Sequence, residues 1–479
     1  MPIQTTVTID SYFFEVENDP KFCRKRKHQV IMFMLRAFLA GAAYSIFLPS
    51  IWFYLDTYDD VESWFLGFVV AVYSIASMVS LPFVGMFFDK TKRIKEIVLV
   101  LNGFEIIGSI VYALPYSKWL VFFGRMIAGF GDGFFACANT AVVHMYPVRS
   151  RTGIFSLLQI GWFLGFICGP LFYFFLTMFA SKLNNQCIIF GILPGAGIAL
   201  LWILFEFGTI FYICNLSKHT EINHGESSIC QIPPASQERM SFDETLYQRT
   251  ESDVSQTKYN DCDVAKPESI KELITQHCSI ELLSLFFSEL AFWSTVTQFL
   301  VLLPLITESD SKWDKYIGII FVLGVVLLMF VFLLIYKFSN KTNVKDQLYV
   351  LISLLLTILS LILLMCEQIP KEKDLKSRFS ILLSACILIF SAISLNLSAV
   401  RSLATKLTPR SMQGFTQGVL SCVSRVALSL GPILAGLSLD HRLKLSITNI
   451  VLCVVAFIWI VLCLKRIKRK SNLMQEIDS

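Results

Sequence analysis

Charged residues are scarce in this sequence. Asp, Glu, Lys and Arg together make up only 16% of its 479 residues, whereas apolar residues make up 55%. A typical soluble domain carries about 25% charged residues. The mean hydropathy of +0.63 points the same way. The composition therefore excludes a soluble globular protein, and we predict a chain that crosses a membrane many times.

Motifs of catalysis and of metal binding are also lacking. The 13 cysteines are scattered, mostly inside apolar runs, and none has C-x-x-C or metal-ligand spacing, so we interpret them as buried thiols. The sequence has no nucleotide-binding loop and no Ser/His/Asp constellation in a domain of its own. We therefore expect no enzyme activity, no cofactor, no bound metal and no nucleic-acid partner.

Apolar segments are what the sequence has in abundance. A segment of about 20 apolar residues crosses the bilayer as a helix. Twelve such segments lie near residues 30–54, 64–88, 96–115, 119–144, 153–180, 188–213, 278–305, 316–338, 347–366, 379–405, 415–439 and 446–464. They predict an all-α polytopic membrane protein with 12 transmembrane helices embedded in the lipid bilayer.

One long polar stretch divides the apolar segments into two sets of six. It is rich in Ser, Glu, Asp, Gln and Asn, and we interpret it as a largely disordered cytosolic linker that offers sites for cytosolic partners. The predicted organisation is a cytosolic tail (1–29), a first six-helix half (30–214), the linker (215–276), a second six-helix half (277–464) and a basic cytosolic tail (465–479).

Basic residues gather at alternate loops. "DKTKRIK" (89–95), "VRSRT" (148–152) and "KRIKRK" (465–470) contrast with the acidic "DTYDDVES" (56–63) of the opposite side. Because loops rich in Lys and Arg stay in the cytosol, both termini are expected there.

The two halves contain a distant repeat. "PVRSRTGIFSLLQIGWFLGFICGP" (147–170) and "PRSMQGFTQGVLSCVSRVALSLGP" (409–432) share their first Pro and their Gly-Pro pair at the same spacing. Parallel repeats of this kind are typical of transporters with a binding site near the midplane, between the halves.

Ionic residues interrupt the fourth segment. Arg125, Asp132 and Asn139 are seven residues apart, so in a continuous helix they share one face. An ion in hydrocarbon costs several kcal/mol unless it faces a cavity or a partner. We predict that Arg125 helps to hold an anionic group and that Asp132 titrates or pairs with a cation. The alternative is an ion pair with another helix, for instance with Glu105.

Further charges lie in the second half. Glu289 is in the middle of the seventh segment and Arg425 in the middle of the eleventh. Either they complete a cavity that bridges the halves, or they neutralise each other. Arg36, Glu281 and Arg401 are closer to the segment ends, and we expect their side chains to extend to the membrane surface.

The loop after the second segment carries a family motif. In "GMFFDKTKR", Gly85 permits close helix approach, and Asp89, followed by Lys90 and Arg93, can pair across the loop and cap the adjacent helix. The loop resembles the signature of the major facilitator superfamily, although Lys92 replaces a Gly of that pattern. The resemblance covers about residues 28–470 and implies that superfamily's fold.

A second motif lies in the fifth segment. Its glycines recur every four residues before a proline, and a Gly-Pro pair recurs in the eleventh segment. This resembles the superfamily's fifth-helix motif and implies a tightly packed seam that shapes the rocking interface rather than contacting substrate. The residues are Gly161, Gly165, Gly169 and Pro170, with Gly431 and Pro432.

A finer resemblance concerns "PSIWFYL" (49–55), "SWFLGFVVAVYSIASMVSLPFVGMFFD" (63–89) and "GRMIAGFGDGFFACANTAVVHMYPVRSRT" (124–152). These stretches are similar to the lysosomal branch linked to neuronal ceroid lipofuscinosis. That branch is related to SPX-domain vacuolar phosphate transporters, but this sequence shows no SPX-like domain before its first segment. The resemblance implies an anion or small-solute carrier of the endolysosomal membrane; the plasma membrane is the alternative.

Three functions remain open on these grounds. The leading hypothesis is a secondary transporter of a small anionic solute by alternating access, with Asp132 or Glu289 as a proton-coupling carboxylate. The second is an anion (chloride) channel or uniporter, in which Arg125 and Arg425 attract anions without protons. The third is a non-transporting scaffold or receptor that recruits cytosolic partners through residues 215–276.

Overall fold

The structure is a computed structural model. It describes residues 20–47, 50–58, 63–180, 188–214, 279–307, 313–339, 346–368, 375–437 and 442–478. The predicted linker at 215–276 therefore lies outside the described residues. Within them the chain forms helices joined by short turns, as a bilayer requires, because lipid offers no hydrogen-bond partner to an open backbone.

In the part of the first half that the structure describes there are eight α-helices. Its elements are α2 (Pro20–Ile46), α3 (Ile51–Leu55), α4 (Ser63–Thr91), α5 (Ile94–Ala113), α6 (Lys118–Gly131), α7 (Phe134–Met145), α8 (Val148–Ala180) and α9 (Leu193–Tyr212), the last preceded by a π-helical turn (Ile188–Ile192). The predicted first segment is thus divided between α2 and α3, and the predicted fourth segment between α6 and α7.

The second half contains six long helices. They are α13 (Ile280–Thr307), α14 (Trp313–Ser339), α15 (Asp346–Gln368), α16 (Leu375–Leu407), α17 (Gln413–Leu437) and α18 (Arg442–Asp478), with a 3₁₀ turn (Arg410–Met412) before α17. Ten helical spans of the described residues are long and apolar enough to cross a membrane. With α6 and α7 counted as one, the long helices number twelve, and the predicted all-α fold of two halves is confirmed.

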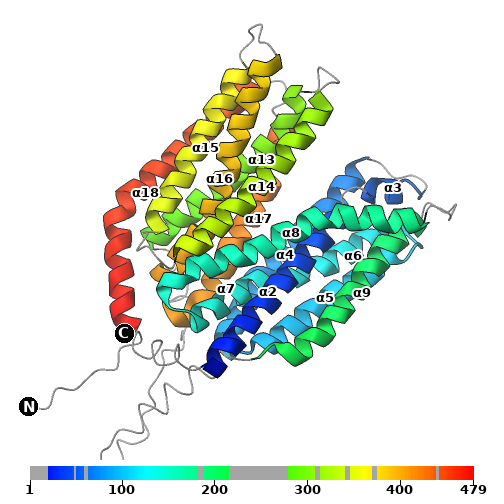
Figure 1. The fold of residues 1–479 in the computed structure, drawn as a ribbon, viewed down its shortest axis with the longest axis horizontal. Coiled ribbons are helices and arrows are strands. Elements are labelled where there is room, and N and C mark those ends of the chain that lie inside the picture. Colours follow the sequence, from blue (N-terminus) through cyan, green and yellow to red (C-terminus); the bar gives the residue numbers. More distant parts are fainter. Residues whose placement is uncertain are drawn as a thin grey trace, which may run out of the picture.

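The helices form two bundles that meet along two seams (Figure 1). In the first bundle α2 packs on α8, and α5 packs on both α6 and α9. In the second, α15 packs on α16 and α18, and α13 packs on α17. The bundles join where α4 contacts α17 and where α8 contacts α14. With α6 and α7 counted as one, the second and fifth long helices of the first half thus meet the fifth and second long helices of the other half.

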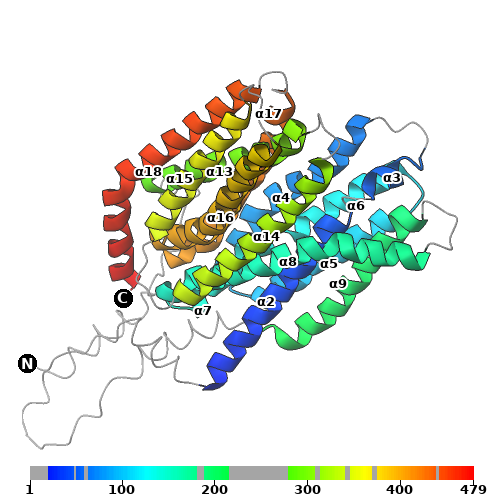
Figure 2. The ribbon, with the colours of Figure 1, turned by 45° about the horizontal axis from the view of Figure 1, so that its top comes forward.

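One end of the molecule carries the basic residues, and we call it the basic end. The helices α2, α5, α8, α13, α15 and α17 begin there, whereas α4, α7, α9, α14, α16 and α18 end there, so α18 finishes at the end where α2 starts. Lys90 and Lys406 lie in the last turns of α4 and α16 at this end, and Arg93 and Arg410 lie in the segments that follow them. The two bundles diverge toward the opposite end (Figures 1 and 2).

The predicted glycine seam packs inside the first half. A Cβ atom at Gly161 would lie 2.5 Å from the carbonyl oxygen of Met34, and one at Gly165 would overlap the carbonyl oxygen of Phe38, so both glycines face α2. In the second half, Gly431 faces α13 in the same way, against Thr297. The predicted tightly packed seam is present, but these glycines place it within each bundle, between α8 and α2 and between α17 and α13, rather than at the interface between the halves.

Candidate functional site

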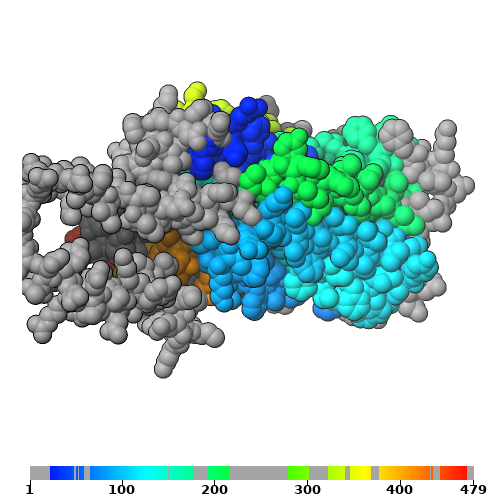
Figure 3. Space-filling model, turned by 90° about the horizontal axis from the view of Figure 1, so that it is seen from below, coloured from blue at the N-terminus to red at the C-terminus, as the bar shows by residue number. Residues whose placement is uncertain are grey.

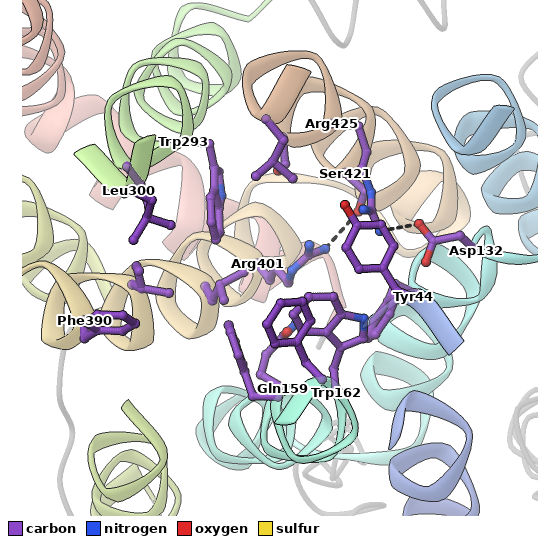
Figure 4. A pocket seen from close by; sticks show the side chains of 18 of the residues that line it. Tyr44, Asp132, Gln159, Trp162, Trp293, Leu300, Phe390, Arg401, Ser421 and Arg425 are labelled. Carbon is purple, nitrogen blue, oxygen red and sulfur yellow. Dashed lines mark hydrogen bonds and ion pairs between the residues drawn. The ribbon is translucent and has the colours of Figure 1, made fainter. Parts of the chain in front are cut away.

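A cavity of about 430 Å³ lies between the two halves (Figure 4). Both bundles supply its walls: α2, α4, α7 and α8 from the first half, and α13, α14, α16 and α17 from the second. It lies between the halves, as the parallel repeat predicts.

Aromatic rings make up much of the cavity wall. On the first half, Trp162 stacks on Phe166 with ring centroids 5.4 Å apart, and Tyr44 stacks on Phe166 at 6.3 Å. Trp293 and Phe390 line the wall supplied by the second half (Figure 4). Such a wall offers a solute a large apolar contact area and few polar partners.

Two arginines and one carboxylate are the charged residues among the described lining. Arg425 of α17 forms an ion pair with Asp132, which also accepts a hydrogen bond of 2.6 Å from Ser77 of α4. The pair therefore joins the second half to the first. It explains how the bilayer tolerates Asp132, because a buried charge needs a partner.

Arg401 of α16 lies lower in the same cavity, toward the basic end. Its Nη1 donates to the hydroxyl of Ser421 at 2.9 Å, and its Nε has no hydrogen-bond partner among the described residues. Figure 4 shows its guanidinium directed into the space between Trp162 and Ser421. Among the described residues the guanidinium makes one side-chain hydrogen bond, to a hydroxyl, and interacts at longer range with the carboxylate of Glu289, so it keeps donors for an anion.

Asp132 is positioned by an interruption between α6 and α7. The backbone N–H of Asp132 bonds to the carbonyl of Gly129, and that of Ala136 to the carbonyl of Gly133, so the chain tightens to the i→i+3 pattern there. Such a stretch within a membrane helix is common at functional hinges. The carbonyl oxygen of Gly131 accepts a hydrogen bond of 2.8 Å from Nη2 of Arg36 in α2.

Arg125 lies outside the cavity lining. Its guanidinium is buried over the rings of Phe47 at 5.1 Å and Tyr73 at 4.6 Å, with Tyr44 between it and the cavity. Asn139, the third member of the predicted face, is buried and its amide makes no hydrogen bond to the described residues. Only Asp132 of the predicted stripe reaches the cavity, because the helix is interrupted at that residue.

Glu289 of α13 lies behind the cavity wall. Its carboxylate accepts hydrogen bonds from Ser424 at 2.7 Å, from Trp293 at 2.9 Å and from Asn396 at 2.8 Å. Arg425 turns instead to Asp132 across the interface. The alternative in which Glu289 and Arg425 neutralise each other is therefore wrong. Of the four charges that were predicted to complete a cavity between the halves, Asp132 and Arg425 line it, and Glu289 and Arg125 do not.

Arg36 and Arg401 correct a second expectation. Both were expected to extend to the membrane surface, yet Arg36 is 0% exposed and Arg401 is 7% exposed. Arg36 is held by Asn102 at 3.2 Å as well as by Gly131, and its guanidinium lies over two aromatic rings. Polar residues within the neighbouring helices can hold these arginines inside the protein, and the sequence-based expectation did not take them into account.

The family model of the Major Facilitator Superfamily matches residues 33–432. This chain belongs to the Major Facilitator Superfamily. A relative from Xenopus laevis, "Major facilitator superfamily domain-containing protein 8", is 25% identical to this chain over 236 residues. These residues cover 48% of this chain and 46% of that protein. The match thus spans about half the length of this relative.

Two solved structures show the same fold. The human organic anion transporter MFSD10 superposes with a TM-score of 0.61 at 15% identity, covering 91% of this chain and 99% of that one. The proton:xylose symporter XylE superposes with a TM-score of 0.65 at 12% identity, covering 92% and 96%. At such low identities these likenesses concern the arrangement of helices alone.

The superfamily's signature loop joins the halves at the basic end. Asp89, at the end of α4, accepts hydrogen bonds of 2.8 Å from the backbone N–H groups of Gly414 and Phe415, which open α17. Gly85 permits this contact, because a Cβ there would overlap the carbonyl oxygen of Gly414. The helix that Asp89 caps thus belongs to the other half, where the N-terminal N–H groups lack intrahelical partners.

A second polar contact closes the other seam. Asp346, at the start of α15, accepts a hydrogen bond of 3.0 Å from the hydroxyl of Thr152 in α8. It also forms an ion pair of 2.6 Å with Lys406. One turn further in, the hydroxyls of Ser156 and Ser398 lie 2.8 Å apart. The loop between α14 and α15 lacks the signature Asp, and Asp346 supplies the equivalent contact from the next helix.

Replacing Asp89 by Ala is expected to weaken the closed basic end. Loss of a helix cap costs about 0.5–2 kcal/mol, so the thermal unfolding midpoint in detergent should fall by a few degrees. The midpoint of Asp89→Asn should fall less, because its side chain keeps one acceptor oxygen. Equal midpoints for Asp89→Ala and the parent chain would show that the two hydrogen bonds to α17 contribute nothing.

Proposed function

We propose that this protein is a secondary transporter that moves a small amphipathic organic anion through the cavity between its halves by alternating access. The observation that carries the proposal is Arg401, a cavity-lining arginine whose side chain binds a hydroxyl and whose Nε is unsatisfied among the described residues. Arg425, in contrast, is already occupied by Asp132.

The character of the lining favours an organic anion over an inorganic one. A chloride or phosphate ion leaving water needs several polar donors, and most of this wall is aromatic or aliphatic. One guanidinium with aromatic rings around it fits a single carboxylate or sulfonate attached to an apolar body. The likeness in fold to an organic anion transporter supports this direction.

The closed basic end favours a carrier over a channel. The contacts of Asp89 with α17 and of Asp346 with α8 close both seams on one side of the cavity. A channel needs a continuous open path, whereas alternating access needs such contacts to break and re-form. The positive-inside rule supports a cytosolic position of this basic end, in which case the cavity faces the lumen or the outside. The resemblance to the lysosomal branch supports an endolysosomal membrane.

The test uses the two tryptophans of the cavity wall. Binding of 4-nitrobenzoate to purified protein should quench the fluorescence of Trp162 and Trp293, and the neutral 4-nitrobenzamide should bind more weakly. Arg401→Gln should remove the preference for the anion and raise its Kd by about 10- to 100-fold, because a charge-assisted hydrogen bond contributes about 1.5–3 kcal/mol.

A matched control lies on the same helix. Arg378, near the other end of α16, pairs with Glu367 outside the cavity, so Arg378→Gln should bind 4-nitrobenzoate as the parent chain does. If Arg401→Gln bound the anion and the amide exactly as the parent does, the assignment of the anion to Arg401 would fail. Saturable uptake of radiolabelled 4-nitrobenzoate into proteoliposomes then separates a carrier from a channel.

A further inference from the structure

Three carboxyl groups are buried near the middle of the membrane helices, and one of them differs from the others. Asp132 is held by Arg425 and Ser77, and Glu289 by three donors. Glu105 of α5 is 2% exposed, and its Oε1 has no hydrogen-bond partner among the described residues. The first two carboxyl groups are thus held by hydrogen-bond donors, whereas Glu105 faces the charges of Arg36 and Arg125 with its Oε1 unbonded among the described residues.

Glu105 lies at the interruption between α6 and α7. A Cβ atom at Gly131 would lie 2.6 Å from the Cγ and 3.0 Å from the Cδ of Glu105, so the carboxyl group packs directly against the residue that precedes Asp132. Arg36 reaches the same place from α2, where it binds the carbonyl of Gly131. Glu105, Arg36 and Asp132 therefore converge on one point of the chain.

The first half surrounds Glu105 with charged and titratable groups. Asn102, one turn before it on α5, links Arg36 to the half-buried Glu206, with 2.7 Å between its Nδ2 and the carboxylate. Figure 3 shows α9, which carries Glu206, on the outer face between α2 and α5. The groups that face this cluster are Arg36 of α2, Tyr73 of α4, Arg125 of α6, Asp132 between α6 and α7, Cys137 of α7 and Glu206 of α9.

We propose that Glu105 carries the transported proton of this carrier, and that the pairing of Asp132 with Arg425 sets how firmly the proton is held. The inference rests on the proposed function, since it names the coupling site of the same transport cycle. An ionised carboxylate without a donor is costly in a buried site, whereas the protonated acid leaves only a neutral oxygen unsatisfied.

The coupling follows from the ion pair that crosses the interface. When the halves separate at α7 and α17, Arg425 leaves Asp132, and the negative charge of Asp132 then favours a proton on Glu105 beside it. When the pair re-forms, Arg425 neutralises Asp132 and Glu105 holds its proton less firmly, so that the proton passes to water more readily. The position of the halves and the firmness with which Glu105 holds its proton therefore change together.

Infrared spectroscopy of the purified full chain tests the protonation directly. A protonated carboxyl gives a C=O stretching band that shifts in D₂O. We expect this band at neutral pH in the parent chain, its loss in Glu105→Gln and its retention in Glu206→Gln, the matched control in the same cluster. Absence of the band from the parent spectrum overturns the proposal even if Glu105→Gln does not fold.

Transport supplies the second measurement. Uptake of radiolabelled 4-nitrobenzoate driven by an imposed pH gradient should lose its dependence on the gradient in Glu105→Gln and keep it in Glu206→Gln. A gradient-driven uptake that persists in Glu105→Gln overturns the coupling role, even where the infrared band is lost. If no chain takes up the anion while the band disappears only in Glu105→Gln, the assigned substrate is wrong and the protonation of Glu105 stands.

Discussion

Asp132→Ala is expected to be the most damaging single substitution in the cavity. It leaves the guanidinium of Arg425 buried between the halves without its carboxylate. Removing one partner of a buried ion pair costs about 3–5 kcal/mol, because the remaining charge stays desolvated and uncompensated. The thermal unfolding midpoint should fall by many degrees, and uptake of 4-nitrobenzoate should be lost.

The reciprocal change should be milder. In Arg425→Met, Asp132 keeps the hydrogen bond from Ser77 and still faces the positive charge of Arg36. The double variant Asp132→Ala/Arg425→Met should be more stable than Asp132→Ala alone, because neither charge is then left unpaired. It should remain inactive, since the contact that joins the halves is missing.

A second pair of residues serves as the control. Glu367 and Arg378 form an ion pair with the arginine partly exposed, where such pairs contribute about 0–1 kcal/mol. Their single and double variants should differ little from the parent chain. Strictly additive effects of Asp132→Ala and Arg425→Met on the midpoint would contradict the ion pair as the source of the stability.

A covalent bond across the basic end is expected to stop transport completely. Ser156 of α8 and Ser398 of α16 face each other across the two halves with 2.8 Å between their hydroxyl oxygens. Cysteines at both positions should oxidise to a disulfide that holds the basic end closed, and reduction should restore uptake of 4-nitrobenzoate.

Cleavage between the halves reveals the new bond. With a protease site placed within residues 215–276, the two fragments of Ser156→Cys/Ser398→Cys should stay joined on a non-reducing gel and separate after reduction. Ser156→Cys/Ser384→Cys is the matched control, because Ser384 lies on an exposed face of α16. Full transport by the oxidised Ser156→Cys/Ser398→Cys chain would contradict a carrier whose basic end must open.

The sequence predicted the fold well, because hydropathy alone reports which helices cross a bilayer. The number of segments, the division into halves and the pairing of Gly-Pro motifs need no knowledge of contacts between helices. The helix interruption at Asp132 was less visible, since it depends on local hydrogen bonds of Gly129 and Gly133. A continuous helix would place Arg125 and Asn139 on the same side as Asp132. Because the helix is interrupted, that prediction was wrong for Arg125 and Asn139.

The candidate site was predicted in part. Asp132 and Arg425 were selected as intramembrane charges, and both line the cavity. Arg401 was assigned to the membrane surface because it is close to the end of its segment. That rule does not consider hydrogen-bond partners on neighbouring helices. Ser421 on α17 makes the buried position of Arg401 possible, and that partner is far away in the sequence.

The depth of Arg401 determines where the membrane voltage acts. Arg401 is fewer than two helical turns from Leu407, the last residue of α16. An anion that reaches it from the open side has already crossed most of the insulating layer. Moving one charge through 100 mV involves about 2.3 kcal/mol. Most of this electrical work is therefore done when the anion binds, and little is done when the halves change conformation. Voltage should therefore change the apparent affinity for the anion more than the maximal rate.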